Sequence, residues 1–262
     1  MGARTVEYVC PACKGELRCY GGERACPACS LEFPEEGGIP DFAGNLRGEG
    51  GSTLMKRAYG TFFNLIAPIY ESWAWYQLTL NLSGASESSI ESIARFVAEV
   101  LGGIDGAILD VACGPATYGR RIASPQRCVY GVDLSRGMLR RGAVLAAREN
   151  REGLSLARSR AECLPFPDAA FDAAICCGSL HLFPDPVQAL GEIARTMRPG
   201  ALLALQTFLT SGQGDARDKI GYHPYEEDEL RGKVEAGGFS DIRVDRIGTV
   251  LLARARKAPA SS

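Results

Sequence analysis

The sequence has no apolar run long enough for a membrane span, no P-loop and little net charge. No segment reaches the roughly 18 apolar residues that a spanning helix needs. The start, MGARTVEYVCPACKG, lacks the apolar region and cleavage site of a secretory signal. A formal net charge of −2 gives no sign of a polyanionic partner. No Gly-Lys-Ser/Thr occurs, which excludes a Walker phosphate loop. We therefore expect a cytoplasmic protein without membrane segments.

Cysteine, by contrast, is abundant, with 10 residues in a chain where disulfides are not expected. Four of them follow the pattern Cys-x2-Cys, twelve residues, Cys-x2-Cys, namely Cys10, Cys13, Cys26 and Cys29. Two such turns on either side of a Gly-Gly hairpin can direct four thiolates at one zinc ion. Free thiols or a redox pair are the alternatives, although a redox pair usually stands alone. We predict a zinc ribbon over residues 1–42, with one structural zinc in place of a core.

The remainder of the chain alternates between strand and helix patterns. Residues 43–54 are rich in glycine and polar residues and are predicted to be a linker. A helix after residue 84 is expected to begin with a capping box of Ser88 and Glu91. Five strand patterns separated by helices follow, and the end, DIRVDRIGTVLLARAR, reads as two strands around Gly248. The alternation predicts an α/β fold with a doubly wound, mostly parallel, seven-stranded sheet and a C-terminal antiparallel hairpin.

The stretch ILDVACGPATYG, residues 108–119, ends the first of these strands, where such sheets bind ligands. It departs from the dinucleotide fingerprint because Ala116 replaces the middle glycine and Pro115 removes an amide donor. Ala116 also argues against a left-handed backbone at that position. A ligand without phosphate groups would tolerate these changes.

Several motifs in order carry a specific resemblance. ILDVACGPA and GVDLSRGML resemble successive motifs of the class I S-adenosylmethionine-dependent methyltransferases, and LPFPDAAFDAAICCGSLHLFPDPVQALGEIARTMRPG resembles their remaining signature. The likeness is greatest to the branch, called type 11, that holds quinone C-methyltransferases. The ribbon ending in GIPDF resembles those of ribosomal-RNA guanine methyltransferases. The resemblance implies an active enzyme with a Rossmann-like S-adenosylmethionine-binding domain over residues 84–262, preceded by an aromatic-rich cap segment, 55–83.

The resemblance also implies roles for single residues. Asp110 would hold the methionine ammonium of the cofactor, and Asp133 would accept both ribose hydroxyls, with a helix N-cap as its alternative role. Arg160 stands where relatives carry an acid for the adenine amino group, and a guanidinium cannot accept a hydrogen bond. Glu162 or the backbone near Ala161 would replace it. The full set of predicted cofactor contacts is Tyr59, Tyr70, Asp110, Ala112, Gly114, Asp133, Leu134, Met138, Ala161, Glu162 and Cys177. Core packing is the alternative for Leu134 and Met138.

The acceptor of the methyl group is less determined. Of the 2 histidines, His181 is expected at the mouth of the site and His223 in a loop, and either could serve as a general base. Trp73 and Trp75 of the cap segment are predicted to wall a pocket for a small, largely apolar metabolite, methylated at carbon or oxygen. Ribosomal RNA, bound by the zinc ribbon and methylated at a guanine nitrogen as the ribbon's resemblance implies, is the alternative substrate. Arginines in residues 136–160 would add a basic face. A methyltransferase-like partner protein without activity is a further alternative.

Overall fold

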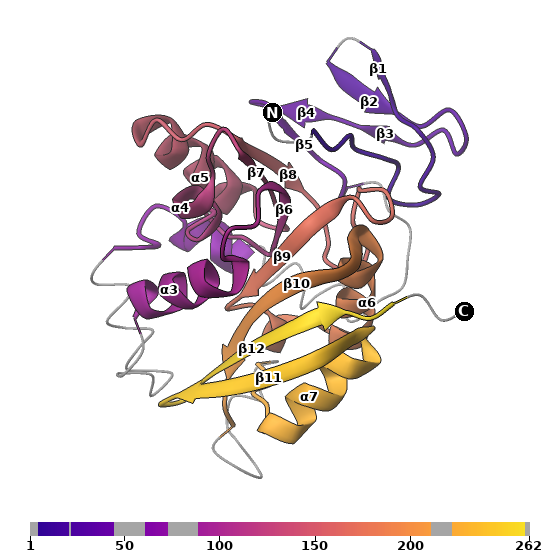
Figure 1. Cartoon of the computed structure of the whole chain (residues 1–262). Coiled ribbons are helices and arrows are strands. Elements are labelled where there is room, and N and C mark those ends of the chain that lie inside the picture. The colour runs from indigo at the N-terminus through magenta and orange to yellow at the C-terminus, as the bar shows by residue number, and fades with distance from the viewer. Residues whose placement is uncertain (1–4, 21, 45–60, 73–88, 211–221, 260–262) are drawn as a thin grey trace.

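The computed structural model describes residues 5–20, 22–44, 61–72, 89–210 and 222–259. Its main feature is a seven-stranded sheet in the order β11-β12-β10-β9-β6-β7-β8 (Figure 1). The strands are β6 (Gly106–Val111), β7 (Arg127–Asp133), β8 (Leu154–Arg158), β9 (Phe171–Cys177), β10 (Met197–Phe208), β11 (Phe239–Ile247) and β12 (Val250–Lys257). Only β12 runs antiparallel to its neighbours, β10 and β11. The predicted doubly wound sheet with a C-terminal hairpin is confirmed.

From residue 89 onward, the helices expected before and between the strands are present, together with one 3₁₀ helix that was not predicted. They are α3 (Ile90–Leu101), α4 (Gly119–Ile122), α5 (Arg136–Arg148), the short 3₁₀ helix η1 (Leu180–Leu182), α6 (Pro186–Thr196) and α7 (Glu227–Ala236). Asp185 caps α6, since its side chain accepts from the amide of Gln188. The capping box of α3 was predicted one residue too early. It joins Ser89 and Ser92, whose hydroxyls accept from each other's amides, and not Ser88 and Glu91.

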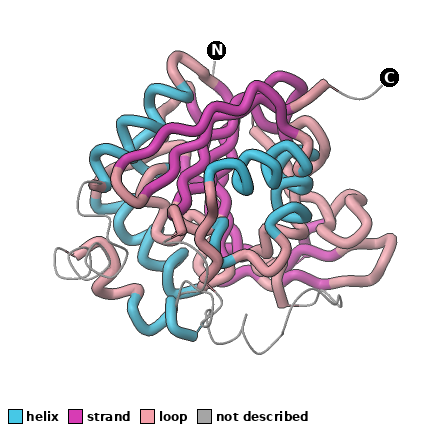
Figure 2. The backbone as a smooth tube through the Cα atoms, turned by 90° about the horizontal axis from the view of Figure 1, so that it is seen from below, coloured by secondary structure: helices cyan, strands magenta, loops and turns pink. Residues whose placement is uncertain are grey.

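Alternate residues of each strand serve opposite faces of the sheet, which has helices on both sides (Figure 2). Ile108 of β6 packs in one cluster with Val97 of α3 and Ala123 after α4. Leu109, its neighbour in β6, packs in the cluster that holds Leu190 of α6 and Leu230 of α7. Each face thus has its own apolar core, and both sides of the central strands are buried.

The face that carries α6 and α7 would be bare over β7 and β8, because residues 159–170, which lead from β8 to β9, contain no helix. The N-terminal residues 5–44, called the ribbon below, cover it. They form the sheet β1 (Arg18–Tyr20), β2 (Glu23–Ala25) and β3 (Glu32–Phe33), and the pair β4 (Glu35–Glu36) and β5 (Ile39–Pro40). Phe33 and Phe42 are 0% exposed and share a cluster with Tyr130 of β7 and with Phe166. Ribbon and sheet therefore have a common core.

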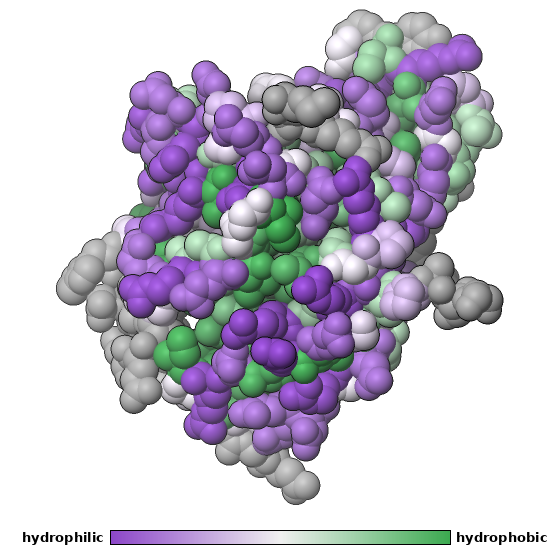
Figure 3. Space-filling model, viewed as in Figure 1, coloured by the Kyte–Doolittle hydropathy of each residue, from purple (hydrophilic) through white to green (hydrophobic). Residues whose placement is uncertain are grey.

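The end of the ribbon also covers the outer edge of β8. Asp41 pairs with Arg158 in parallel register, and the Phe42 amide donates to the Arg158 carbonyl at 2.7 Å. An exposed strand edge invites unwanted pairing, and this segment occupies it. In the view of Figure 3, hydrophilic side chains surround an apolar area over the central strands. No helix among the described residues is long and apolar enough to cross a membrane.

Candidate functional site

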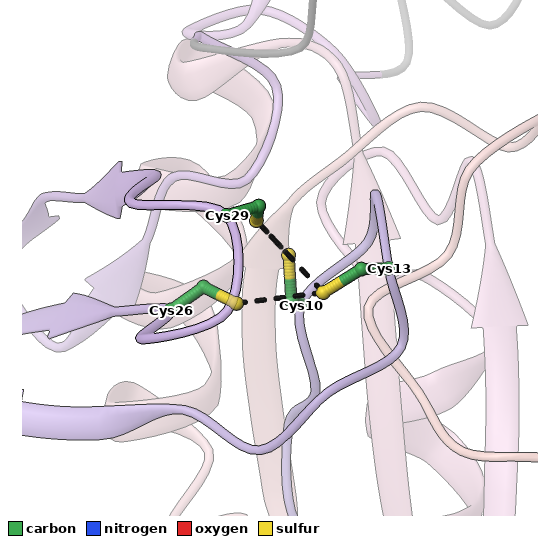
Figure 4. A group of neighbouring side chains, drawn as sticks. All are labelled: Cys10, Cys13, Cys26 and Cys29. Atoms are coloured by element: carbon green, nitrogen blue, oxygen red, sulfur yellow. Dashed lines mark hydrogen bonds between the residues drawn. The ribbon is translucent and has the colours of Figure 1, made fainter.

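The four cysteines of the ribbon converge on one point (Figure 4). All four sulfur atoms lie within 4.8 Å of one another. The Sγ–Sγ distance is 3.4 Å from Cys10 to Cys29 and 3.5 Å from Cys13 to Cys26. With zinc–sulfur bonds of about 2.3 Å, the edge of a tetrahedral site is about 3.8 Å, so these separations suit one zinc ion. The exposed thiol Cys19 lies in β1, outside this group.

The two CPAC turns have the same backbone conformation. The amides of Lys14 and Ser30 donate to the carbonyls of Cys10 and Cys26 at 2.8 and 2.9 Å. Lys14 and Ser30 both have a left-handed backbone, with φ of 58° and 55°. Two equal turns that face each other present their thiolates in the same way, which is what a four-cysteine site requires.

Two carboxylates mark the carboxyl ends of neighbouring strands. Asp110 of β6 is 2% exposed, and its Oδ2 accepts from the amide of Gly119 at 3.2 Å. Asp133 ends β7, and its oxygens accept from the amides of Gly114 at 2.8 Å and Ser135 at 2.7 Å. Burial raises the pKa of Asp110 to about 7 and also raises the pKa of Asp133. The strand order reverses at β6, so the pair lies where doubly wound sheets bind ligands.

Ser135, and not Asp133, is the N-cap of α5, because its hydroxyl accepts from the amide of Met138. The alternative reading of Asp133 as a cap is therefore wrong. Its carboxylate instead joins the loop after β6 to the loop after β7. We call residues 133–135 the β7 loop.

The loop after β6 keeps a left-handed backbone without the usual glycines. Ala112, Gly114 and Ala116 have φ of 51°, 56° and 56°. The expectation that Ala116 would remove this conformation is wrong. Left-handed alanine costs about 1–2 kcal/mol, and packing offsets it here. Ala116 is fully buried, and α5 approaches so closely that a Cβ on Gly142 would lie 2.9 Å from the Pro115 oxygen.

Residues 61–72, the described part of the cap segment, contact both loops. Oδ1 of Asn64 accepts from the hydroxyl of Ser135 at 2.8 Å and from the amide of Gly137 at 2.7 Å. Tyr70 lies over the loop after β6, since a Cβ built on Gly114 would be 4.0 Å from its ring. Burial, with the negative charge of Asp133, raises the pKa of the Tyr70 phenol to about 12.

A second attachment joins the cap segment to α4. Arg120 is 5% exposed, and its Nη2 donates to the two carboxylate oxygens of Glu71 at 2.8 and 2.7 Å. Its Nε donates to the Pro115 carbonyl at 2.9 Å. The cap segment is thereby fixed to the loop after β6. The predicted residues Tyr59, Trp73 and Trp75 lie outside the described residues.

The other predicted cofactor contacts surround the same strand ends. Leu134 is half-buried in the β7 loop. Met138 is 2% exposed, which agrees with its alternative role in core packing. Ala161 is 9% exposed and belongs to the core on the ribbon side. Cys177 ends β9, beside Gln206 of β10. Their contact with the cofactor stays a prediction.

Arg160 and Glu162 stand in the turn after β8. The amide of Cys163 donates to the carbonyl of Arg160 at 3.2 Å. The Nε of Arg160 is buried without a hydrogen-bond partner among the described residues. Glu162 is half-buried. The contact of Glu162 with the adenine amino group stays a prediction.

Of the two candidate bases, His223 lies in a loop as expected, whereas His181 differs from expectation. His181 is 3% exposed, packed edge-on against Phe208 and at 4.1 Å from the ring of Tyr222. It is therefore in the core below the loops and not at an open mouth. His223 is exposed and lines a groove of about 480 Å³ with Phe183, among others. The His223 amide donates to the His181 carbonyl at 2.8 Å, so the two residues are neighbours.

Two arginines of α5, which belong to the basic group in residues 136–160, hold the ribbon at the surface of the molecule. Arg136 pairs with Glu36 at 3.1 Å and also contacts Asp41, and Arg140 pairs with the same Glu36. These charges are matched inside the molecule.

Sequence reasoning missed the residues that support the loops. They are Asn64, Glu71, Arg120, Asp41 and Arg158. Each acts through a partner far away in the chain, and the only local signal is the GIPDF motif that contains Asp41.

Comparison with known proteins agrees with this geometry. Residues 109–205 match the family described as methyltransferase domain. An uncharacterized chloroplastic methyltransferase of Arabidopsis thaliana is 33% identical over 132 residues, 48% of this chain and 36% of that protein. A demethylmenaquinone methyltransferase of Listeria monocytogenes is 35% identical over 100 residues, 37% of this chain and 42% of that protein. The structure of the cyclase SpnF has a TM-score of 0.63 at 20% identity and covers 81% of this chain and 99% of its own.

The chain is thus similar to the S-adenosylmethionine-dependent methyltransferases in the order of its sheet and in the matched domain. Over 100 residues it is similar to a quinone methyltransferase. It spans less than half the length of these two curated relatives. The predicted cytoplasmic location stays a prediction, and so do the boundaries between ribbon, linker, cap segment and sheet.

Proposed function

We propose that this protein transfers a methyl group from S-adenosylmethionine to a small, largely apolar acceptor. The observation that carries the proposal is the pair Asp110 and Asp133 at the ends of β6 and β7, with Asp133 bonded to the loop after β6 through the Gly114 amide. The cofactor supplies an electrophilic methyl group. The protein must orient the acceptor and exclude water, which is mainly a positioning effect.

The residues present suit the cofactor. Each oxygen of Asp133 accepts one backbone amide and keeps a lone pair for a ribose hydroxyl. Asp110 has one amide partner and no cation beside it in the described structure. A ligand ammonium would supply the missing positive charge. Pro115 leaves the loop short of amide donors, which a nucleoside without phosphate tolerates.

The acceptor class follows from charge and from the cap segment. The net charge is −2, and Arg136 and Arg140 are already paired with the ribbon. RNA binding would need such arginines free beside the site. The aromatic-rich cap segment and the similarity to a quinone methyltransferase favour an apolar acceptor, methylated at carbon or oxygen.

We further propose that Cys10, Cys13, Cys26 and Cys29 hold one structural zinc. Four thiolates complete a tetrahedral site and leave no open position for a substrate. The zinc would therefore stabilise the ribbon and take no part in methyl transfer.

Two measurements test the activity. Isothermal titration should show binding of S-adenosylmethionine, and labelled methyl should enter the small-molecule fraction of a cell extract. Label in one RNA nucleotide would establish the RNA alternative. Binding without any transfer would favour a non-catalytic role or, as the cyclase SpnF reminds us, another use of the same fold.

Asp133→Ala tests the cofactor site itself. It removes the acceptors for two ribose hydroxyls, and we expect the affinity for S-adenosylmethionine to fall by about 2–3 kcal/mol. Calorimetry on the folded variant measures this. Unchanged affinity would exclude Asp133 from the cofactor site.

A further inference from the structure

We infer that Asp41 of the ribbon and Arg158 of β8 are positioning residues that couple the ribbon to the cofactor site through the β7 loop. The inference rests on the proposed function, because it concerns how tightly S-adenosylmethionine binds. The ribbon would then support cofactor binding in addition to covering the core.

Asp41 is a buried acid surrounded by donors. It is 4% exposed, and its carboxylate accepts from Nη1 of Arg158 at 2.9 and 3.1 Å, from Arg136, and from the amide of Ala43 at 3.0 Å. A buried charge is tolerated only when it is matched in this way. The position of Asp41 is set by the ribbon, since Ile39–Pro40 and Phe42 on either side of it lie along β8 and in the shared core.

Arg158 carries the contact from Asp41 to the cofactor site. Its Nε donates to the carbonyl of Leu134 at 2.8 Å while Nη1 holds Asp41. The next residue, Ser159, donates its amide to the carbonyl of Asp133 at 3.1 Å. The planar guanidinium has donors in a fixed fork, so fixing one end orients the other. The β7 loop, with the proposed ribose ligand Asp133, is thereby held from the ribbon side.

The opposite side of the same loop is held by the cap segment, through Asn64 and Ser135. Loss of Asp41 would leave Arg158 and Arg136 without their shared buried carboxylate. Arg158 could then turn away from Leu134, and the loop would keep the cap segment and the backbone amides of Ser159 and Gly114 but lose its side-chain contact with the ribbon side. The cofactor would have to order the loop as it binds, which weakens binding.

The chain offers a matched control in Lys14, which also joins the ribbon to the sheet. Its Nζ pairs with Glu192 at 3.0 Å and donates to the carbonyl of Leu164 at 3.2 Å. Neither partner belongs to the β7 loop. Lys14→Gln therefore weakens the attachment of the ribbon without breaking the contact between Arg158 and Leu134.

The experiment measures S-adenosylmethionine affinity by calorimetry on the full-length, zinc-loaded protein. The variants are Asp41→Asn, Arg158→Lys, the double variant and Lys14→Gln, each checked for folding by circular dichroism. Arg158→Lys keeps a cation for Asp41 but lacks the forked donors, and it carries the test if Asp41→Asn does not fold.

We expect Kd to rise about tenfold in both single variants, within the range usual for coupled sites. The double variant should be no weaker than the weaker single one, because both break the same connection. Lys14→Gln should stay within about twofold of wild type. Removing zinc with a chelator should raise Kd of the wild type but add little in Asp41→Asn. If turnover is measured, KM for the cofactor should rise while kcat is kept.

Two results would overturn the inference in different ways. A wild-type protein that does not bind S-adenosylmethionine refutes the proposed function and the inference with it. A wild-type protein that binds, with folded Asp41→Asn or Arg158→Lys variants of equal affinity, or with Lys14→Gln equally impaired, refutes the inference alone.

Discussion

The ribbon and the sheet are stabilised by different means. Strands β6 and β9, at the centre of the sheet, are covered by apolar clusters on both faces, with Leu109 and Ile175 among residues that are 0% exposed. The ribbon has only a few buried residues, and those pack against the sheet, as Phe33 and Phe42 do. Its remaining order comes from the convergence of four cysteines.

The difference shows that the ribbon is not an autonomous module attached to the sheet. It replaces the helix that is missing between β8 and β9 and closes the face over β7 and β8. A small segment can contribute to a larger core when a metal ion supplies the rigidity that its own burial cannot. The following changes act on one side of this comparison or on the boundary between the two.

Cys26→Ser should have the largest effect. It removes one of four ligands, so we expect loss of about one zinc per chain and unfolding of the ribbon while the central sheet stays folded. Zinc analysis with amide exchange of residues 5–44 and 106–133 measures both. A metal-free wild-type protein with a protected ribbon would contradict the zinc assignment.

Phe42→Ala acts at the boundary. The ring is 0% exposed and lies 5.2 Å from those of Tyr8 and Phe33. We expect the free energy of unfolding to fall by about 3–5 kcal/mol. Val144→Ala on the outer side of α5, 46% exposed, is the control and should cost under about 0.5 kcal/mol. Urea unfolding compares them, and equal costs would mean that the ribbon does not share the core.

Asp110 belongs wholly to the sheet, and its contribution to the free energy of unfolding depends on pH. Burial raises its pKa to about 7 in the cofactor-free protein. Because the folded pKa exceeds the unfolded one, the stabilisation is complete below about pH 4 and is lost as pH rises through about 7. Asp110→Asn should remove this loss of stability at higher pH.

Cofactor binding should show the opposite trend, because the ammonium prefers the ionised acid. We expect affinity for S-adenosylmethionine to fall about tenfold per pH unit below pH 7 in the wild type. In Asp110→Asn the affinity should be lower and nearly independent of pH. Calorimetry at pH 6, 7 and 8 decides, and a flat wild-type profile would exclude Asp110 as the partner of the ammonium.

Ala112→Gly should have the smallest effect. The left-handed alanine, with φ of 51°, costs about 1–2 kcal/mol, and glycine removes this strain. Greater freedom of the unfolded chain cancels about 0.5–1 kcal/mol of the gain. We expect a net stabilisation of about 0.5 kcal/mol, seen as a small rise in Tm, and a clear destabilisation would mean that the methyl group is needed in the loop.

Local patterns were enough to predict the strands, the alternation with helices, the convergence of the four cysteines and the two strand-end carboxylates. They failed where the outcome depends on packing. The Ala116 backbone and the burial of His181 were both misjudged, because each is settled by residues on other elements. The capping box of α3 was placed one residue early, since Ser88 and Ser89 carry the same signal.

The sequence by itself determined the α/β alternation, the two Cys-x2-Cys turns and Asp110 and Asp133 at the strand ends, because these depend on main-chain periodicity and on spacings of a few residues. Only the tertiary structure decided that the ribbon completes the core and that Asp41 holds Arg158. That pair is separated by 117 positions in the chain. No short-range pattern encodes such a contact, because it forms only after the sheet has created the surface on which the ribbon packs.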